Sequence, residues 1–256
     1  MDYLLFRLYG PLASWGDIAV GETRHTASCP GKSAIVGLLS AALGIKRCDT
    51  EKQLMMQQGY ALAVEVNTHG TLLRDFHTAQ VPDSIGNFNY RTRRDELLLG
   101  KARLGTILSS REYRIDALAL VAVRASQNAP HDLKTIKKHL EKPLFHLYLG
   151  RKSCPLAAPM NPQIIEDKKN YFEAFKNYIH KPMMPTNDDS LPRHDVYWLR
   201  QSDDRHYYWE GTVSDFSDTL DLSGMLTRTR HDQPLSRIRW QFSTRQEHYF
   251  HCSGGE

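Results

Sequence analysis

The order of apolar patterns along the chain restricts its fold more than any other feature. Strands are expected where branched and aromatic residues alternate or run together, and helices where apolar residues recur every three or four positions. The order found here, strand, helix, several strands, helix and strand, is that of a ferredoxin-like (RRM-like) βαββαβ core, so we expect an α+β protein. The patterns that carry this prediction lie at residues 3–9, 34–43, 60–67, 72–77, 115–123, 133–140 and 144–149.

Local signals predict where some of these elements begin, end and pair. Ser33 can cap the first helix, and Gly44 is placed to end it. The turn at residues 68–70 would let the strand at 72–77 pair with the strand before it. We expect Trp15 to be a core residue, with an exposed stacking platform as the alternative.

Two stretches do not belong to a bare βαββαβ unit. Prolines and glycines interrupt an arginine-containing segment between His77 and Arg111, and a connection this long is usually functional or disordered. Residues 161–181 have near-helical apolar spacing, and a hairpin pattern follows at 196–200 and 207–213. We expect one domain, 1–256, with a core at 1–78 and 109–160, an insertion at about 79–108, and an insertion with closing strands at about 161–251.

Composition limits the class of protein. The chain has 256 residues, a formal net charge of +4 and four scattered cysteines without a C-x-x-C pair. Such thiols suit a reduced cytosolic protein better than a disulfide framework or a zinc site. No apolar run approaches the length of a membrane span, and the N-terminal residues lack the features of a signal peptide. We therefore expect a cytoplasmic protein that does not enter a membrane.

Two glycine-containing segments are candidate phosphate contacts. Gly150 lets backbone N–H groups approach a ligand, and Arg151 and Lys152 beside it favour a polyanion. At residues 31–33 (Gly-Lys-Ser), the free N–H groups of a helix start, an ammonium group and a hydroxyl could hold one phosphate. An ordinary capped helix is the alternative there. Thr26 stands where a P-loop needs its first glycine, which argues against ATP hydrolysis.

A run of arginines in the 79–108 insertion is a third cationic feature. Arg91, Arg93 and Arg94 are opposed nearby only by Asp95 and Glu96. Most charge runs form a solvated face, and a nucleic-acid contact is the alternative that the positive sign allows.

Several short segments have distinctive amino-acid sequences, although the chemistry of their side chains alone does not identify a function. They keep one order from residue 3 to about residue 250 and are sparse at 79–108 and 160–225. The segments are 8–16 (LYGPLASWG), 21–24 (GETR), 30–39 (PGKSAIVGLL), 75–78 (DFHT), 111–113 (REY), 148–155 (YLGRKSCP), 230–234 (RHDQP) and 241–245 (QFSTR). Together they resemble the fifth CRISPR-associated family of the RAMP superfamily, in particular its members in type I-E Cascade surveillance complexes.

The resemblance implies a non-catalytic RNA-binding subunit with no cofactor and no metal. Such a subunit holds the 5′ handle of the CRISPR RNA (crRNA) and caps the backbone of a complex for antiviral DNA targeting. Its partners would be crRNA, the backbone and large subunits, and target DNA in the assembled complex. The 79–108 insertion corresponds in position to the family's thumb. The implied RNA contacts are Arg24, Lys32, Ser33, Arg74, His77, Arg111, Tyr113, Arg151 and Lys152, with Arg91, Arg93 and Arg94 as nucleic-acid contacts of the thumb.

Two other hypotheses stay open. In a metal-independent endoribonuclease that processes precursor crRNA, His25 or His77 would be a general acid or base, assisted by Lys32 or a tyrosine. In a protein-only scaffold, the basic residues would only solubilise the chain. The two histidines and the cysteine at 248–252 lack a fourth metal ligand, so we expect that end of the chain to fray.

Overall fold

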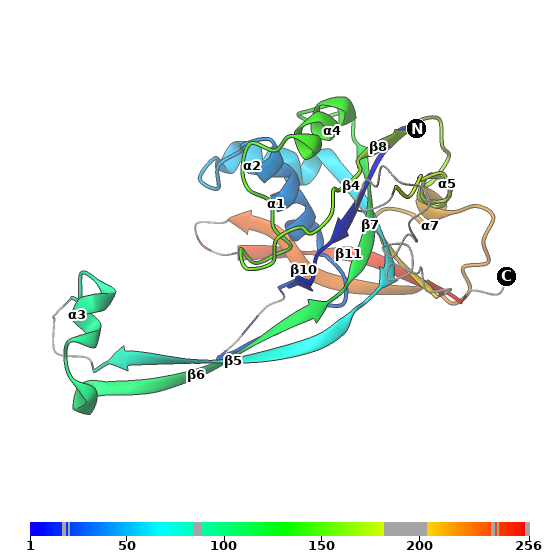
Figure 1. Cartoon of the computed structure of the whole chain (residues 1–256). Helices are drawn as coiled ribbons and strands as arrows, with labels where there is room; N and C mark the ends of the chain where they lie inside the picture. The colour runs from blue at the N-terminus through cyan, green and yellow to red at the C-terminus, as the bar shows by residue number, and fades with distance from the viewer. Residues whose placement is uncertain are drawn as a thin grey trace, which may run out of the picture.

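A mixed α and β body carries a long two-stranded arm that projects from one end (Figure 1). The computed structural model describes residues 1–16, 19, 21–83, 89–181, 204–236, 239 and 241–253. The strands are β1 (Tyr3–Tyr9), β2 (Leu12–Ala13), β3 (Thr23–Arg24), β4 (Tyr60–Thr68), β5 (Thr71–Pro82), β6 (Leu104–Ile115), β7 (Leu118–Ala125), β8 (Gln163–Ile165), β9 (Arg205–Trp209), β10 (Leu226–Ser236) and β11 (Gln241–Cys252). The helices are α1 (Lys32–Ala42), α2 (Thr50–Gly59), α3 (Arg93–Leu97), the 3-10 helix η1 (Lys101–Arg103), α4 (Leu133–Glu141), α5 (Tyr171–Lys176) and α7 (Val213–Phe216).

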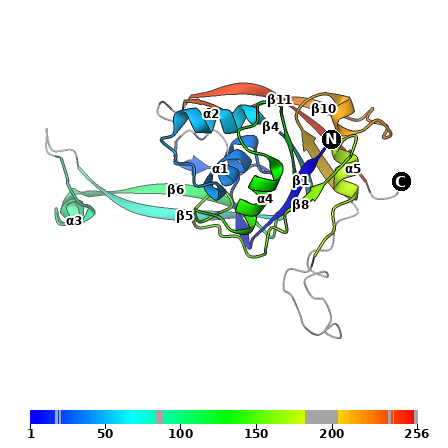
Figure 2. The ribbon, with the colours of Figure 1, turned by 90° about the horizontal axis from the view of Figure 1, so that it is seen from above.

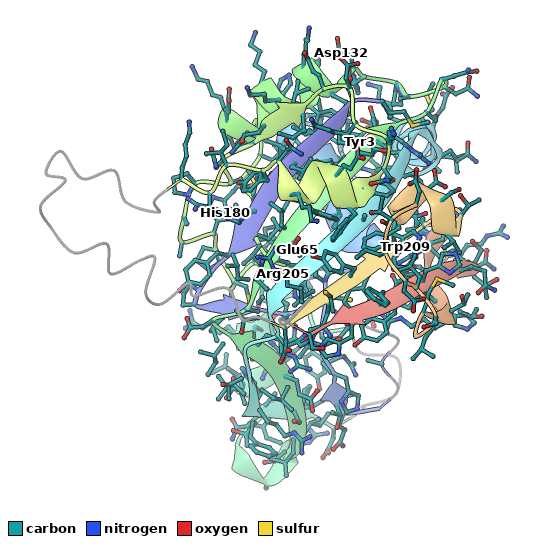
Figure 3. The ribbon with its side chains drawn as sticks, turned by 90° about the vertical axis from the view of Figure 1, so that its right-hand side faces the viewer. Tyr3, Glu65, Asp132, His180, Arg205 and Trp209 are labelled. Atoms are coloured by element: carbon teal, nitrogen blue, oxygen red, sulfur yellow. The ribbon has the colours of Figure 1, made fainter. Side chains whose placement is uncertain are left out.

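The body is built on one seven-stranded antiparallel sheet in the order β10-β11-β9-β4-β7-β1-β8. The central strands β1 and β7 are mostly apolar and largely buried, because helices cover both faces of the sheet. Leu4 and Phe6 of β1 pack in the core that α1, α2 and α4 complete, whereas Tyr3 and Leu5 pack in the core beneath α5 and α7. Figure 2 shows α1, α2 and α4. Figure 3 is viewed from the side of α5 and α7, and Tyr3 and Trp209 are buried in the core beneath these two helices. The predicted α+β class is confirmed.

The described residues of the arm are 71–83 and 89–115, and its two strands pair over their whole length. Thr71 lies opposite Ile115 at the root, and Pro82 lies opposite Leu104 near the far end. Short strands β2 and β3 pair with β6 at the root, whereas α3 and η1 lie at the far end (Figures 1 and 2). The predicted pairing of 72–77 with 60–67 is wrong, because both edges of the buried strand β4 are occupied by β7 and β9.

Other local predictions have mixed outcomes. Gly44 follows the end of α1 with a left-handed backbone (φ 73°), as expected for a helix stop. Trp15 is a core residue, which confirms that prediction. The single helix expected at 161–181 is wrong: the edge strand β8 comes first, and then Asp167 (φ 56°) breaks the backbone before Asn170 caps α5.

The end of the chain is more ordered than its sequence predicts. The expected hairpin at 196–200 and 207–213 cannot be compared in full, because its first strand lies outside the described residues. Its second part divides into β9 and the start of α7, and β9 pairs with β4 and β11. Fraying at 248–252 is wrong, because His251 and Cys252 pair with His206 and Arg205 of β9.

Three histidine rings are in contact where β9 and β11 meet the turn before the arm: His206 is stacked on His251 and tilted against His69. The His206 ring centroid lies 4.3 Å from that of His69 and 4.5 Å from that of His251, and His206 Nδ1 lies 2.8 Å from the Tyr249 hydroxyl. Burial and the two neighbouring rings lower the pKa of His206 to about 4. The unfolded chain, with a histidine pKa of about 6.5, therefore binds more protons between these values, so stability falls as the pH is lowered across that window.

We expect His206→Phe, which keeps an aromatic ring in the stack, to make this loss of stability shallower between about pH 6.5 and pH 4. Urea unfolding at a series of pH values measures it, and the exposed His231→Gln is the control that should keep the wild-type profile. Identical pH profiles for wild type and His206→Phe would contradict the expectation.

Candidate nucleic-acid interface

Four segments that are far apart in the sequence meet at the root of the arm. Arg24 of β3 lies beside Arg111 of β6, and Arg111 lies opposite Asp75 of β5 on its other side. The loop that follows Leu149 joins them, because the Ser14 N–H donates to the Leu149 carbonyl at 3.0 Å. The structure thereby gathers cationic residues that the sequence analysis took from separate motifs. We call this set the root surface: Arg24, Arg111 and Arg151 lie around one face of β6, and His25 and Arg74 lie beside Glu112 on the other face.

A buried carboxylate organises the root surface. The side chain of Glu112 is only 6% exposed, whereas those of its partners Arg74 and His25 are 52% and 58% exposed. Glu112 Oε1 accepts from Arg74 Nη2 at 2.8 Å, and Oε2 lies 3.1 Å from His25 Nδ1 and accepts from the Thr26 N–H at 3.3 Å. Burial alone would raise the pKa of Glu112, but these hydrogen bonds lower it below its ordinary value. Glu112 is therefore a fixed negative charge beneath exposed cationic partners.

Arg151 connects the loop to the two strands. Its guanidinium donates to the carbonyl oxygens of Glu112 and Arg24, at 3.3 Å each, and lies 4.8 Å from the Tyr113 ring centroid. A planar guanidinium can make both kinds of contact at once. Tyr113 is buried beneath it, so its ring supports Arg151 and is not open to a base. Lys152, the next residue, is exposed.

Gly150 allows this loop to approach the body closely. Its φ is 85°, and a Cβ at this position would lie 1.8 Å from the Ser14 carbonyl oxygen. Gly21 also has a left-handed φ, 77°, but nothing lies within 4 Å of the corresponding Cβ position. This turn therefore requires glycine for a steric reason in addition to the conformational one.

We expect Gly150→Ala to destabilise the fold more than Gly21→Ala, which should cost about 1–2 kcal/mol for the left-handed backbone alone. The difference isolates the clash with Ser14. Urea unfolding of both variants measures it, and equal losses of stability would show that the loop moves away from the body without cost.

Lys32 and Ser33 are not placed as the sequence analysis predicts. Lys32 is buried, with its Nζ 2.8 Å from Glu210 Oε2, and its N–H donates to Asp232 Oδ2 at 2.9 Å. The Asp232 carboxylate already lies where a phosphate would bind at the start of α1. Gly31 holds the cap position, so the prediction that Ser33 caps this helix is wrong. Neither residue belongs to the root surface.

The remaining predicted contacts lie along the arm. His77 Nε2 lies 2.5 Å from Asp75 Oδ2, one step along β5 from the root surface. Near the far end, Arg93 pairs with Glu96 and also donates to the Gln80 carbonyl. The side chains of Arg91 and Arg94 are exposed there, so the structure separates the thumb arginines from the root surface.

Sequence reasoning did not find Glu112 as a functional residue. Only Arg111 and Tyr113 were singled out from the segment at 111–113, and the structure places the Arg111 and Glu112 side chains on opposite faces of β6. The sequence did contain one signal. Successive side chains of a strand point to opposite faces, so an acidic residue between Arg111 and Tyr113 must face other neighbours than those two residues do.

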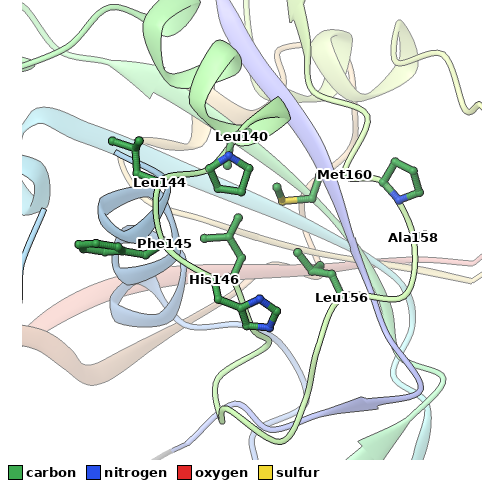
Figure 4. A pocket seen from close by; sticks show the side chains of 10 residues that line it. Leu140, Leu144, Phe145, His146, Leu156, Ala158 and Met160 are labelled. Carbon is green, nitrogen blue, oxygen red and sulfur yellow. The ribbon is translucent and has the colours of Figure 1, made fainter. Parts of the chain in front are cut away.

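An apolar groove of about 480 Å³ opens on another part of the body (Figure 4). Its lining includes Leu140 of α4, Leu144, Phe145 and Met160, of which Leu144 and Phe145 are strongly exposed. His146 lies at one side of the groove (Figure 4). Such a surface suits apolar side chains of a protein better than RNA phosphates.

The described part of the chain offers no metal site. There, no group of three or more His, Cys, Asp or Glu side chains has the geometry to hold a metal ion. No helix of that part is long and apolar enough to cross a membrane. All four cysteines are free thiols.

Fold and site together define an α+β protein with a cationic surface at the root of a long hairpin arm. The family model described as CRISPR-associated protein (Cas_Cas5) matches residues 3–247. The CRISPR system Cascade subunit CasD of Escherichia coli (strain K12) is 34% identical over 168 residues, which cover 62% of this chain and 69% of that relative. The chain belongs to the CRISPR-associated Cas5 family.

Solved structures agree with this assignment at the level of the fold. A structure described as a CRISPR RNA-guided surveillance complex contains a chain with a TM-score of 0.64 and 22% identity, covering 97% of this chain and 89% of that one. A second, described as the crystal structure of a Cas protein, has a TM-score of 0.55 and 22% identity, covering 98% and 95%.

Proposed function

We propose that this chain is a non-catalytic RNA-binding subunit of a type I-E CRISPR Cascade complex, acting in the cytoplasm. It holds the 5′ handle of crRNA and caps the backbone of the complex for antiviral DNA targeting. The observation that carries this proposal is the convergence of Arg24, Arg74, Arg111 and Arg151 at the root of the arm. The name of the E. coli relative, a Cascade subunit, supports the assembly that we propose.

We propose further that the chain is a single domain with a ferredoxin-like core. The adjacent strands β8, β1, β7 and β4, with α1 and α2 between β1 and β4 and α4 between β7 and β8, support this. The distal half of the arm, about 79–108, is then the thumb, and β9, β10 and β11 are additional strands that extend the core sheet.

The root surface has the properties that a short single strand requires. Guanidinium groups can fork onto phosphates or stack on unpaired bases, and phosphate contacts fix the register of the strand. In this proposal Arg24, Arg74, Arg111 and Arg151 make these contacts, with Lys152 and His77 at the margin. Tyr113 contributes by supporting Arg151.

The arm and the groove account for the partners. On one face of the arm, Phe76 is 74% exposed and Leu108 is 57% exposed, which is unusual for a free hairpin. We propose that nucleic acid and a neighbouring backbone subunit cover the arm, with Arg91, Arg93 and Arg94 at its end. The apolar groove then suits the large subunit or another subunit of the complex.

The proposal is tested by incubating the purified chain with RNA from its own CRISPR repeat, without added metal, and scoring binding and cleavage separately. We expect binding of the 5′ handle without a cut. A cut at one defined position that is abolished in His25→Ala or His77→Ala would make the chain an endoribonuclease instead. Unchanged affinity in both Arg74→Ala and Arg151→Ala would leave only the scaffold hypothesis.

A further inference from the structure

We propose that Glu112 is a positioning residue for RNA binding. Although it is acidic, its carboxylate holds cationic side chains of the RNA-binding surface in place. This inference rests on the proposed function. Glu112 itself is nearly inaccessible, so it acts through the two exposed side chains that its carboxylate holds, Arg74 and His25. No other described acidic side chain contacts more than one member of the root surface.

The geometry allows the carboxylate to be separated from the rest of the site. Ser14 Oγ and Arg151 Nη1 donate to the main-chain carbonyl of Glu112, at 3.1 Å and 3.3 Å, and not to its side chain. A Glu112→Gln substitution therefore leaves these two contacts in place. It replaces one of the two carboxylate oxygens by an NH2 group, so the side chain loses as an acceptor either its contact with Arg74 or its contacts with His25 and the Thr26 N–H.

The sign of the effect distinguishes positioning from simple charge. If Glu112 only added negative charge near RNA, then its neutralisation would strengthen binding, because repulsion of phosphates would fall. If Glu112 holds Arg74 and His25 in place, the same substitution weakens binding, because at least one of these side chains loses its acceptor and becomes free to leave the surface. A long cationic side chain that must be ordered on binding contributes less to affinity.

The test measures the affinity of the full-length chain for RNA from its own CRISPR repeat at fixed salt. We expect Glu112→Gln to weaken binding about tenfold, the effect of removing one charged hydrogen bond. The control is Glu22→Gln, an exposed carboxylate two residues before Arg24, which should bind RNA as well as wild type or better. In the His25→Ala, Arg74→Ala background, Glu112→Gln should change affinity by less than about twofold, because the residues it acts through are absent.

Each other outcome overturns a stated part. Equal or tighter binding by Glu112→Gln would make Glu112 a mere repulsive charge. A full tenfold loss in the double-variant background would make its role structural. No binding by wild type would overturn the proposed function and this role with it. If Glu112→Gln does not fold, then Glu112→Asp keeps the charge but withdraws it by one methylene, and the same comparisons apply.

Discussion

Replacing Arg151 by alanine is expected to weaken binding of repeat RNA at least tenfold. Arg151 holds the loop after Leu149 against β3 and β6 through the carbonyls of Arg24 and Glu112, so the substitution removes one cation and loosens its neighbours. The slope of log affinity against log salt should become shallower by about 0.7 for each phosphate of a single strand that the variant no longer neutralises. Fluorescence anisotropy at several salt concentrations measures both quantities.

Two variants control this prediction. Lys52→Ala removes one exposed positive charge on α2, away from the arm, and should change neither affinity nor slope. Arg151→Lys keeps the charge, but an ammonium group cannot reproduce the planar contacts to two carbonyls and the Tyr113 ring, so its affinity should be intermediate. Wild-type affinity in Arg151→Ala would mean that RNA binds elsewhere.

Replacing Arg245 by alanine is expected to destabilise the fold by about 3–5 kcal/mol, the cost of removing one partner from a buried ion pair. Its guanidinium lies 2.6 Å and 2.9 Å from the two carboxylate oxygens of Asp232 and 2.6 Å from Glu247 Oε1. The side chains of Arg245, Asp232 and Glu247 are 8%, 12% and 5% exposed, so water would not fully replace the guanidinium as their partner. Asp232 also accepts from the Lys32 N–H, and therefore the β10–β11 hairpin would loosen from α1.

Urea unfolding at neutral pH measures the decrease in stability. The matched control is Arg93→Ala, which removes an exposed Arg–Glu pair near the end of the arm and should cost less than about 1 kcal/mol. A decrease below about 1 kcal/mol in Arg245→Ala would show that the hairpin is not held by this buried network.

The parts of the fold that were predictable are those with local causes. The β1 and α4 patterns at 3–9 and 133–140 match the observed elements closely, because apolar spacing within one segment decides them. Strand pairing is not local. The turn at 68–70 was interpreted as a hairpin, whereas β5 pairs with β6, which begins only after the whole distal end of the arm. Nothing in the sequence of β5 specifies that partner.

In the candidate site, too, residues in local motifs could be predicted, whereas contacts between distant segments could not. Arg24, Arg111 and Arg151 were predicted from three separate motifs and Arg74 from the position before a fourth, and the structure brings their strands and loop together at the root of the arm. Lys32 was assigned to RNA from the Gly-Lys-Ser sequence at a helix start. Its ion-pair partner in the structure, Glu210, is 178 residues away and could not be identified from that local sequence. Glu112 was overlooked because an acidic residue is not expected to contact RNA. Its importance lies in its buried carboxylate, which holds Arg74 and His25 in place.

The most direct test of this account is photo-crosslinking of repeat RNA that carries 4-thiouridine in the 5′ handle, with crosslinked peptides mapped by mass spectrometry. The account predicts crosslinks to peptides that contain residues 21–26, 74–77, 109–113 and 148–153. Crosslinks confined to α2 or to the β10–β11 hairpin, with none at the root of the arm, would contradict it.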